Sequence, residues 1–346
     1  MAGPLSTRVT LARWLSPVAP PGSPEGVNRV SVGVEPKAAG DRPFEAWLYR
    51  AAGRPRGSWL ISPGLHFKGP SDPRLDRFCR ILAKAGFVVL APFLPDHLLL
   101  RLDRGSIGDL DRAFGVLAGQ PDCGPDPRPG IFSVSFGSFP AICVAGRRGA
   151  SVRRLLLFGG FARFREVCRF ACREESPDPF CQAVVFLNLV DRIREAPVDS
   201  APLFAAWRRM AEETWNRPEM APREAWAAVA ERVALSAPEG EMRRLFRMGA
   251  RLDGGGAEWV EAALAQELPA LDPEPAGIRC PVRIFHGADD PVIPTGQAAL
   301  LSEMIPGSKM RITGLYGHAD RAASASPLAL LKDGATLLAM LQALAG

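Results

Sequence analysis

The stretch from Gly130 to Gly137, GIFSVSFG, decides the predicted fold because a short apolar run leads directly into a serine beside small residues. Gly130–Ser133 predicts a strand, and Phe139–Val144 predicts the helix that follows it. A tight turn between them would lift the hydroxyl of Ser135 out of the sheet and point helix N–H groups toward an oxyanion. Considered alone, the same pattern also fits an ordinary loop between a strand and a helix.

On both sides of this stretch, apolar runs of strand length alternate with helical patterns. Asp72 and Pro73 begin a predicted helix that ends at Gly86, and Asp109–Ala118 and Leu328–Ala345 predict two more. The other predicted strands are Asn28–Val34, Phe44–Tyr49, Ser58–Ser62, Phe87–Ala91, Arg154–Phe158, Val282–Phe285 and Met310–Ile312. This alternation predicts an α/β protein with a mainly parallel, doubly wound sheet, whose first two strands are antiparallel.

The pattern changes after Gly160. Residues 161–275 carry almost no strand signal, and prolines and the glycines at 254–256 break them into helical segments, so we expect a helical cap inserted into the core. The core is expected over 27–160 and 276–346. Residues 1–26 include the Pro-, Gly- and Ser-rich tract Ser16–Gly26 and are expected to form a flexible N-terminal arm.

Composition excludes several classes of protein. The chain has 346 residues, 47% of them apolar, and a formal net charge of +5, which excludes disorder over most of the length. No apolar run approaches the roughly 18 residues of a membrane span, and Arg13 interrupts the only apolar stretch of the first twenty residues, so neither a span nor a secretory signal is expected. Basic residues are scattered, which gives no reason to expect a nucleic-acid partner.

The seven cysteines are an odd number without a predicted signal, which favours reduced thiols and a cytoplasmic location. Cys168, Cys172 and Cys181 form the one cluster, and no histidine lies near them in the sequence. The four histidines, His66, His97, His286 and His318, are widely separated. We therefore expect no metal site and no cofactor.

Carboxylates follow the predicted strand Val282–Phe285, where parallel sheets place their chemistry. Asp290 is our choice for the acid that orients a histidine, with Asp289 as the alternative. The same residues also fit a turn that leads into a helix near Thr295.

His318 lies just past the predicted strand Met310–Ile312 and follows Asp290 by 28 residues. Imidazole titrates near neutrality, so His318 is the candidate base. Pro63-Gly64-Leu65-His66 follows an earlier strand, and a turn there would present the N–H of Leu65 to an oxyanion, with the N–H of Phe136 as second donor. No role is assigned to His66.

With a nucleophile, an acid and a base in this order, the chain resembles the α/β-hydrolase superfamily, over about 28–160 and 276–346. Ile278–Val282, leading into His286-Gly287, is similar to that family's return from cap to core. The resemblance implies Ser135 as nucleophile, Asp290 as acid and His318 as base, with Leu65 and Phe136 forming the oxyanion hole. The tight turn around the nucleophile is called the elbow. Ser133 stands where the family has the first glycine of this elbow, and Pro63 stands where the family often has histidine.

The expected function is a serine hydrolase, of carboxylesterase or lipase type, that cleaves a carboxylic ester or a related acyl bond through a Ser-His-Asp triad and an acyl-enzyme. The Trp, Phe and Leu content of the cap favours a small-molecule acyl substrate of apolar character. Two alternatives remain open: an acyltransferase or carbon–carbon bond hydrolase on the same fold, and a non-catalytic binding module.

Overall fold

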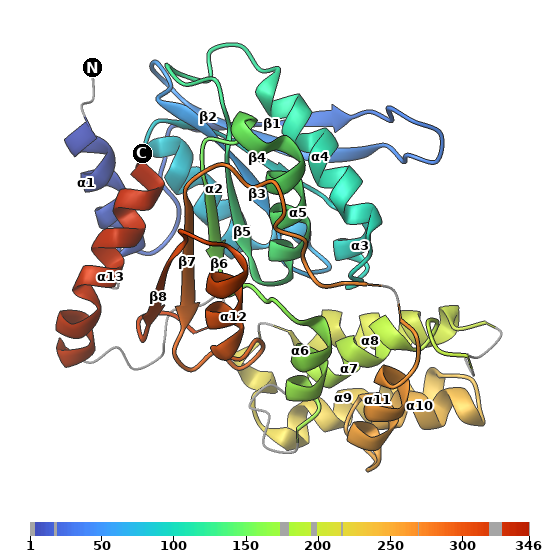
Figure 1. Ribbon diagram of the computed structural model, residues 1–346. Coiled ribbons are helices and arrows are strands. Elements are labelled where there is room, and N and C mark those ends of the chain that lie inside the picture. The colour runs from blue at the N-terminus through green and yellow to red at the C-terminus, as the bar shows by residue number, and fades with distance from the viewer. Residues whose placement is uncertain are drawn as a thin grey trace. The chain divides into compact units, whose positions relative to one another are not determined.

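The computed structural model describes residues 4–16, 19–173, 180–194, 199–215, 217–268, 270–317 and 327–345 (Figure 1). The chain divides into two compact units. The core unit comprises Met1–Leu98, Asp103–Ala162 and Asp272–Gly346, and the helical unit comprises Leu99–Leu102 and Arg163–Leu271.

The core unit is built on one sheet of eight strands, in the order β1-β2-β4-β3-β5-β6-β7-β8. The strands are β1 (Val27–Val34), β2 (Phe44–Ala51), β3 (Gly57–Ser62), β4 (Phe87–Pro92), β5 (Gly130–Val134), β6 (Leu155–Phe158), β7 (Val282–Gly287) and β8 (Lys309–Thr313). Strand β2 pairs antiparallel with β1 and with β4, and the remaining pairs are parallel. The predicted α/β class with a mainly parallel sheet is confirmed.

Helices cover both faces of this sheet, which is why β3, β4 and β6 are buried along their whole length and read as unbroken apolar runs. One face carries α1 (Pro4–Leu15), α2 (Pro73–Lys84) and α13 (Pro327–Ala345), and the other carries α4 (Gly105–Ala118) and α5 (Ser138–Arg148) (Figure 1). The connections add α3 (Pro95–Leu98), α12 (Gly296–Met304) and the short 3-10 turns η1 (Gly69–Ser71), η2 (Ser135–Gly137) and η3 (Gly149–Ser151).

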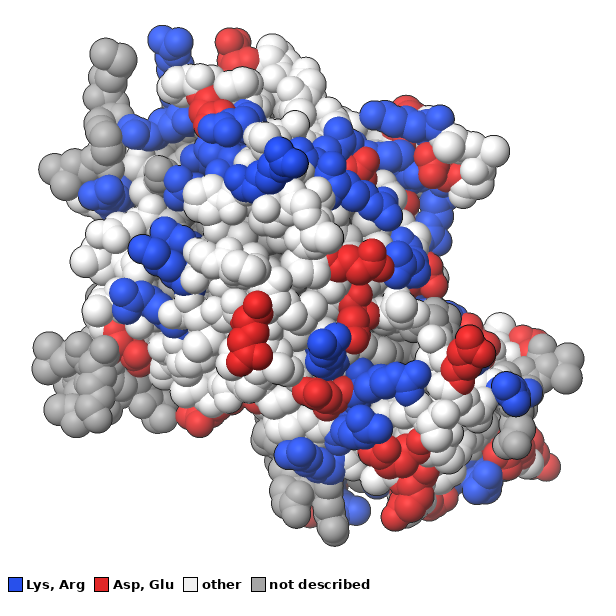
Figure 2. All heavy atoms as spheres, in the orientation of Figure 1, with Lys and Arg blue, Asp and Glu red and all other residues white. Residues whose placement is uncertain are grey.

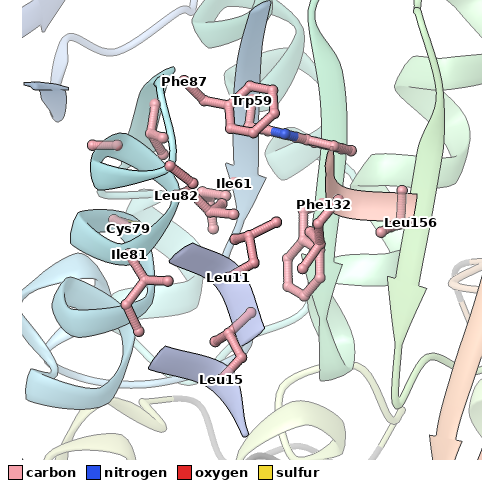
Figure 3. Packing of buried hydrophobic residues seen from close by; sticks show 14 of the residues in the cluster. Leu11, Leu15, Trp59, Ile61, Cys79, Ile81, Leu82, Phe87, Phe132 and Leu156 are labelled. Atoms are coloured by element: carbon pink, nitrogen blue, oxygen red, sulfur yellow. The ribbon is translucent and has the colours of Figure 1, made fainter. Parts of the chain in front are cut away.

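A large apolar cluster lies between the sheet and the α1–α2–α13 layer. Figure 3 shows Trp59 and Phe132 from the strands facing Leu82 from α2 and Leu11 from α1. These side chains are fully or almost fully buried. Burial of each such side chain contributes roughly 1.5–3 kcal/mol to the stability of the fold. These contacts hold α1, α2 and α13 against the sheet that carries the candidate site.

The N-terminal segment is not the flexible arm that the sequence led us to expect. Pro4–Leu15 forms α1, whose Leu11 is fully buried, and Thr7 Oγ1 donates a hydrogen bond to the carbonyl oxygen of Ala85. The guanidinium of Arg77 donates to the carbonyl oxygens of Trp14, Pro20 and Gly22 and so fastens the following tract. The Pro- and Gly-rich composition predicted a loose chain because it gives no indication of these distant partners.

The helical unit contains α6 (Phe164–Ala171), α7 (Cys181–Leu189), α8 (Ala201–Thr214), α9 (Arg223–Ser236), α10 (Glu241–Gly249), α11 (Gly256–Leu264) and the turn η4 (Pro218–Met220). Its described residues form no strand. Leu99–Leu102, which the sequence assigned to the core, belongs to this unit: Asn188 accepts a hydrogen bond from the N–H of Leu102 and donates one to the carbonyl oxygen of Leu100. Trp207 is buried between Phe186 and Phe246, so this tryptophan packs the helices together.

Basic side chains are less evenly scattered than the sequence indicated. Figure 2 shows Lys and Arg gathered over the end of the core unit where the parallel strands begin. Arg128, Arg153 and Arg154 stand just before β5 and β6. Arg128 pairs with Asp126, and Arg154 donates to the carbonyl oxygen of Ala343, so the fold itself engages part of this charge. The carboxyl ends of the same strands, which carry the candidate site, lie at the opposite edge of the sheet.

Candidate active site

Ser135 stands at the junction of β5 and η2 with φ of +55°, a left-handed backbone conformation that is uncommon for a residue with a side chain. Such a conformation costs on the order of 1–3 kcal/mol and persists only where the surrounding structure imposes it. The residue is 6% exposed. The turn predicted from the sequence therefore forms, and it holds the Ser135 hydroxyl at the carboxyl end of β5.

Two glycines allow the chain to pass close to this turn. A β-carbon added to Gly137 would lie 2.3 Å from the carbonyl oxygen of Ser62, and one added to Gly64 would lie 3.2 Å from the β-carbon of Ser135. The hydroxyl of Ser62 donates a hydrogen bond of 2.8 Å to the carbonyl oxygen of Gly137. The loop after β3 is thus placed directly beside Ser135.

The unusual serine at position 133 does not prevent the sharp turn. Its side chain is fully buried, and its hydroxyl has no hydrogen-bond partner among the residues that the structure describes. The left-handed conformation of Ser135 forms with Ser133 in the place of the family's glycine.

The two candidate acids differ in burial. Asp290 is 6% exposed, and its Oδ1 accepts hydrogen bonds of 2.9 Å from the backbone N–H groups of Val292 and Ile293. Its Oδ2 lies 3.4 Å from Nε2 of His286, which itself contacts the carbonyl oxygen of Ile293 at 2.8 Å. Asp289 is exposed. The backbone bonds therefore hold the carboxylate of Asp290 in the protein interior, whereas that of Asp289 faces water.

His318 lies outside the described residues. The chain is described as far as Gly317, and this last part packs against the carboxyl end of β7: a β-carbon added to Gly287 would lie 2.4 Å from the carbonyl oxygen of Gly317 and 2.5 Å from that of Tyr316. The N–H of Ala288 also donates a hydrogen bond of 2.8 Å to the carbonyl oxygen of Thr313. The chain that leads to His318 thus runs beside the segment that carries Asp290.

This geometry can be compared with solved structures. An acylaminoacyl peptidase bound to a chloromethyl ketone superimposes with a TM-score of 0.50 at 10% identity, over 92% of this chain and 42% of that chain. Its match and the strand order, with a sharp turn after β5, decide the fold. The chain has the α/β-hydrolase fold.

Two esterases are similar at lower scores. One from Pyrococcus furiosus gives a TM-score of 0.49 at 11% identity, over 92% of each chain. One from Rhizomucor miehei gives 0.47 at 12% identity, over 92% of this chain and 84% of that chain. No family model and no curated protein matches the sequence. At 10% identity the match to the peptidase shows the fold alone.

In an α/β-hydrolase fold the loop after β3 faces the elbow, and here it carries Leu65, one candidate oxyanion donor. The backbone N–H of Leu65 has no acceptor among the described residues. Phe136 is the second residue of η2, and the first N–H groups of a helical turn have no partner within it. Neither N–H group donates to a backbone acceptor among the described residues, so both stay candidates for the oxyanion hole.

His66, which received no role from the sequence, contributes to the structure of this loop. Its Nδ1 accepts a hydrogen bond of 3.1 Å from the N–H of Lys68, and its Nε2 lies 3.3 Å from Oδ2 of Asp72. Asp72 begins α2 by accepting from the N–H of Arg74. Burial lowers the pKa of His66 to about 4, so its imidazole is neutral at physiological pH and ties the loop to α2.

His97 is the residue of this region that sequence reasoning missed. It lies in α3, its side chain is buried, and its Nδ1 is 2.9 Å from the carbonyl oxygen of Pro63. Its backbone carbonyl accepts a hydrogen bond from the N–H of His66. In the sequence His97 is only a histidine that follows a strand. Its contact could not be predicted, because Pro63 lies 34 residues earlier in the chain.

Two of the described cysteines are poorly suited to act as nucleophiles. Burial raises the pKa of Cys172 to about 12 and that of Cys280 to about 11, so these thiols are protonated at neutral pH and are poor nucleophiles. Within the described ranges no three His, Cys, Asp or Glu side chains gather into a metal-binding group.

Among the described helices, none combines the length and apolar character that crossing a membrane requires.

Proposed function

We propose that this protein is a serine hydrolase that cleaves carboxylic esters of small, apolar acyl compounds, with Ser135 as nucleophile. The observation that carries the proposal is the left-handed backbone of Ser135 at a strand-to-helix turn, with Gly64 packed against its β-carbon. The strained turn places the Ser135 hydroxyl close to the N–H groups of Leu65 and Phe136. A nucleophile and two oxyanion donors can then act on the same carbonyl group.

Asp290 is proposed as the acid and His318 as the base. Strands β5 and β7 are separated by β6, and adjacent strands lie about 4.8 Å apart, so the strand ends that lead into Ser135 and toward Asp290 are about 10 Å from each other. A hydroxyl and a carboxylate carried beyond two strand ends with one strand between them are best coupled through an intervening group. An imidazole has the required size, and the chain leading to His318 passes beside Gly287, three residues before Asp290.

The reaction proceeds in two halves. Ser135 Oγ attacks the ester carbonyl carbon while the imidazole of His318 takes the hydroxyl proton and Asp290 accepts a hydrogen bond from the other ring nitrogen. The N–H groups of Leu65 and Phe136 stabilise the oxyanion. Collapse of the tetrahedral intermediate breaks the bond to the alcohol, which leaves with the proton from His318. Water, deprotonated by His318, then attacks the acyl-enzyme, and the second collapse releases the acid and restores Ser135.

Active-site labelling tests the nucleophile. Wild-type protein should react with a fluorophosphonate probe and hydrolyse p-nitrophenyl esters of graded acyl length, and Ser135→Ala should lose both activities. Ser302→Ala is a matched control, because that half-buried serine of α12 contacts Ser308 and lies outside the proposed machinery. Equal labelling of wild type and Ser135→Ala would show that another residue is the nucleophile.

A further inference from the structure

His97 contacts both ends of the loop that carries one proposed oxyanion donor. Its imidazole Nδ1 lies 2.9 Å from the carbonyl oxygen of Pro63, and its own carbonyl oxygen accepts a hydrogen bond of 3.2 Å from the N–H of His66. Between these two attachment points lie only Gly64 and Leu65. One residue therefore holds the two-residue stretch that faces Ser135.

The protonation state of this histidine follows from its surroundings. A carbonyl oxygen can only accept, so Nδ1 of His97 carries the hydrogen and donates it to Pro63. The side chain is buried, and burial lowers its pKa to about 4, which leaves the ring neutral at physiological pH. Nε2 is then an acceptor, and it has no hydrogen-bond partner among the described residues. The ring is thus neutral, and its Nδ1 donates to the carbonyl oxygen of Pro63.

The backbone that carries His97 is itself anchored. Asp96 forms an ion pair of 2.5 Å with Arg42. Leu98 packs against Gly69, where an added β-carbon would lie 2.7 Å from Leu98 Cδ2. Because α3 is held on both sides of His97, the imidazole has a rigid base from which to position the loop.

We infer that His97 is a positioning residue that sets the N–H of Leu65 at the distance from Ser135 that oxyanion stabilisation needs. The inference rests on the proposed serine hydrolase function. Loss of its Nδ1 donor would free the carbonyl of Pro63 and let Gly64 and Leu65 move away from the elbow. The loss would weaken the transition state more than ground-state binding, because the oxyanion exists only after attack.

Three substitutions at position 97 separate the hydrogen bond from simple packing. In His97→Asn the amide nitrogen takes the place of Nδ1, so the bond to Pro63 is kept. In His97→Gln the amide group lies farther out, and in His97→Leu the space is filled without a donor. We expect kcat for a p-nitrophenyl ester to fall roughly 10- to 100-fold in the Leu and Gln variants. KM should stay within about twofold, and the Asn variant should recover to within about threefold of wild type.

Two further measurements report on the loop itself. A trifluoromethyl ketone adds to the serine hydroxyl and forms a hemiketal oxyanion, so its Ki should rise in the Leu variant by the same factor as kcat/KM falls. Amide exchange of a peptide spanning 61–68 should speed up in the Leu variant and stay at the wild-type rate in the Asn variant. Leu82→Ala, a truncation near the C-terminal end of α2, controls for general loss of stability, since it should lower Tm without changing the Ki.

The outcomes distinguish the positioning role of His97 from the proposed serine hydrolase function. Ester turnover that disappears in Ser135→Ala while His97→Leu retains wild-type kcat overturns the role of His97 alone. An Asn variant as slow as the Leu variant does the same, because packing would then explain the loss. Turnover that survives in Ser135→Ala overturns the proposed function and the inference together.

Discussion

Gly64 lies directly against Ser135: a β-carbon at position 64 would stand 3.2 Å from the β-carbon of the serine and 3.3 Å from the carbonyl oxygen of Val134. The space beside the proposed nucleophile is therefore filled by the backbone of the neighbouring loop. The loop and the elbow can approach this closely only because position 64 has no side chain.

Gly64→Ala should lower kcat/KM for ester hydrolysis by about 10- to 100-fold, because the methyl group pushes the Leu65 N–H away from the oxyanion position. Steady-state kinetics on the ester panel measures the loss. Gly108→Ala is the control: this glycine lies within α4 and nothing stands within 4 Å of an added β-carbon, so the change should raise stability by roughly 0.5–1 kcal/mol and leave kcat unchanged. A Gly64→Ala enzyme with normal activity would mean that Leu65 is not a donor.

Asp290→Asn should reduce kcat by about 10³- to 10⁴-fold, whereas Asp289→Asn should change it less than about twofold. The amide can no longer accept a hydrogen bond and hold the imidazole of His318 in the reactive tautomer, and Asp290 is the buried member of the pair. Ester kinetics at pH 8 with both purified variants makes the comparison. If Asp289→Asn were the inactive variant, our choice of acid would be wrong.

Stability should fall as pH drops from about 6.5 to about 4, before most carboxylates titrate. Burial lowers the pKa of His97 to about 4, whereas an unfolded chain binds the proton near pH 6.5. Between these values the unfolded state carries a proton that the folded state excludes, so the free energy of unfolding decreases with falling pH. The contribution of His97 is on the order of 3 kcal/mol and is fully present above pH 6.5.

Urea unfolding at pH 7, 6 and 5 measures this dependence. His97→Asn removes the titrating group and should flatten the profile relative to wild type. His66, whose pKa burial also lowers to about 4, would still contribute in that variant, so a residual slope is expected. Identical slopes in wild type and His97→Asn would contradict a buried, neutral imidazole at position 97.

Much of the core could be predicted because its strands are buried on both faces. Runs such as Phe87–Ala91 are apolar without interruption, and the strand β4 forms there. The sharp turn at Ser135 was also predicted, although the local pattern alone fits an ordinary loop, and the order of serine, aspartate and histidine along the chain favoured it. The choice of Asp290 over Asp289 is consistent with their burial, although adjacent residues in a turn differ only through tertiary contacts.

What the sequence could not indicate depends on partners far along the chain. Leu99–Leu102 belongs to the helical unit because Asn188 binds its backbone, and no local pattern marks that contact. His97 gains its place from Pro63, which lies on a different strand end. Long-range hydrogen bonds of this kind leave no periodicity in the residues that make them.

The position of α1 bears on how the protein can be shortened. Its Leu11 and Leu15 pack in one buried cluster with side chains of α2 and α13, so both the first and the last described helix belong to one layer of the fold. A truncated version beginning at Val27 would expose to water the apolar surface of α2 and α13 that α1 covers. Such a product should self-associate, and expression tags are better fused ahead of this helix than put in its place.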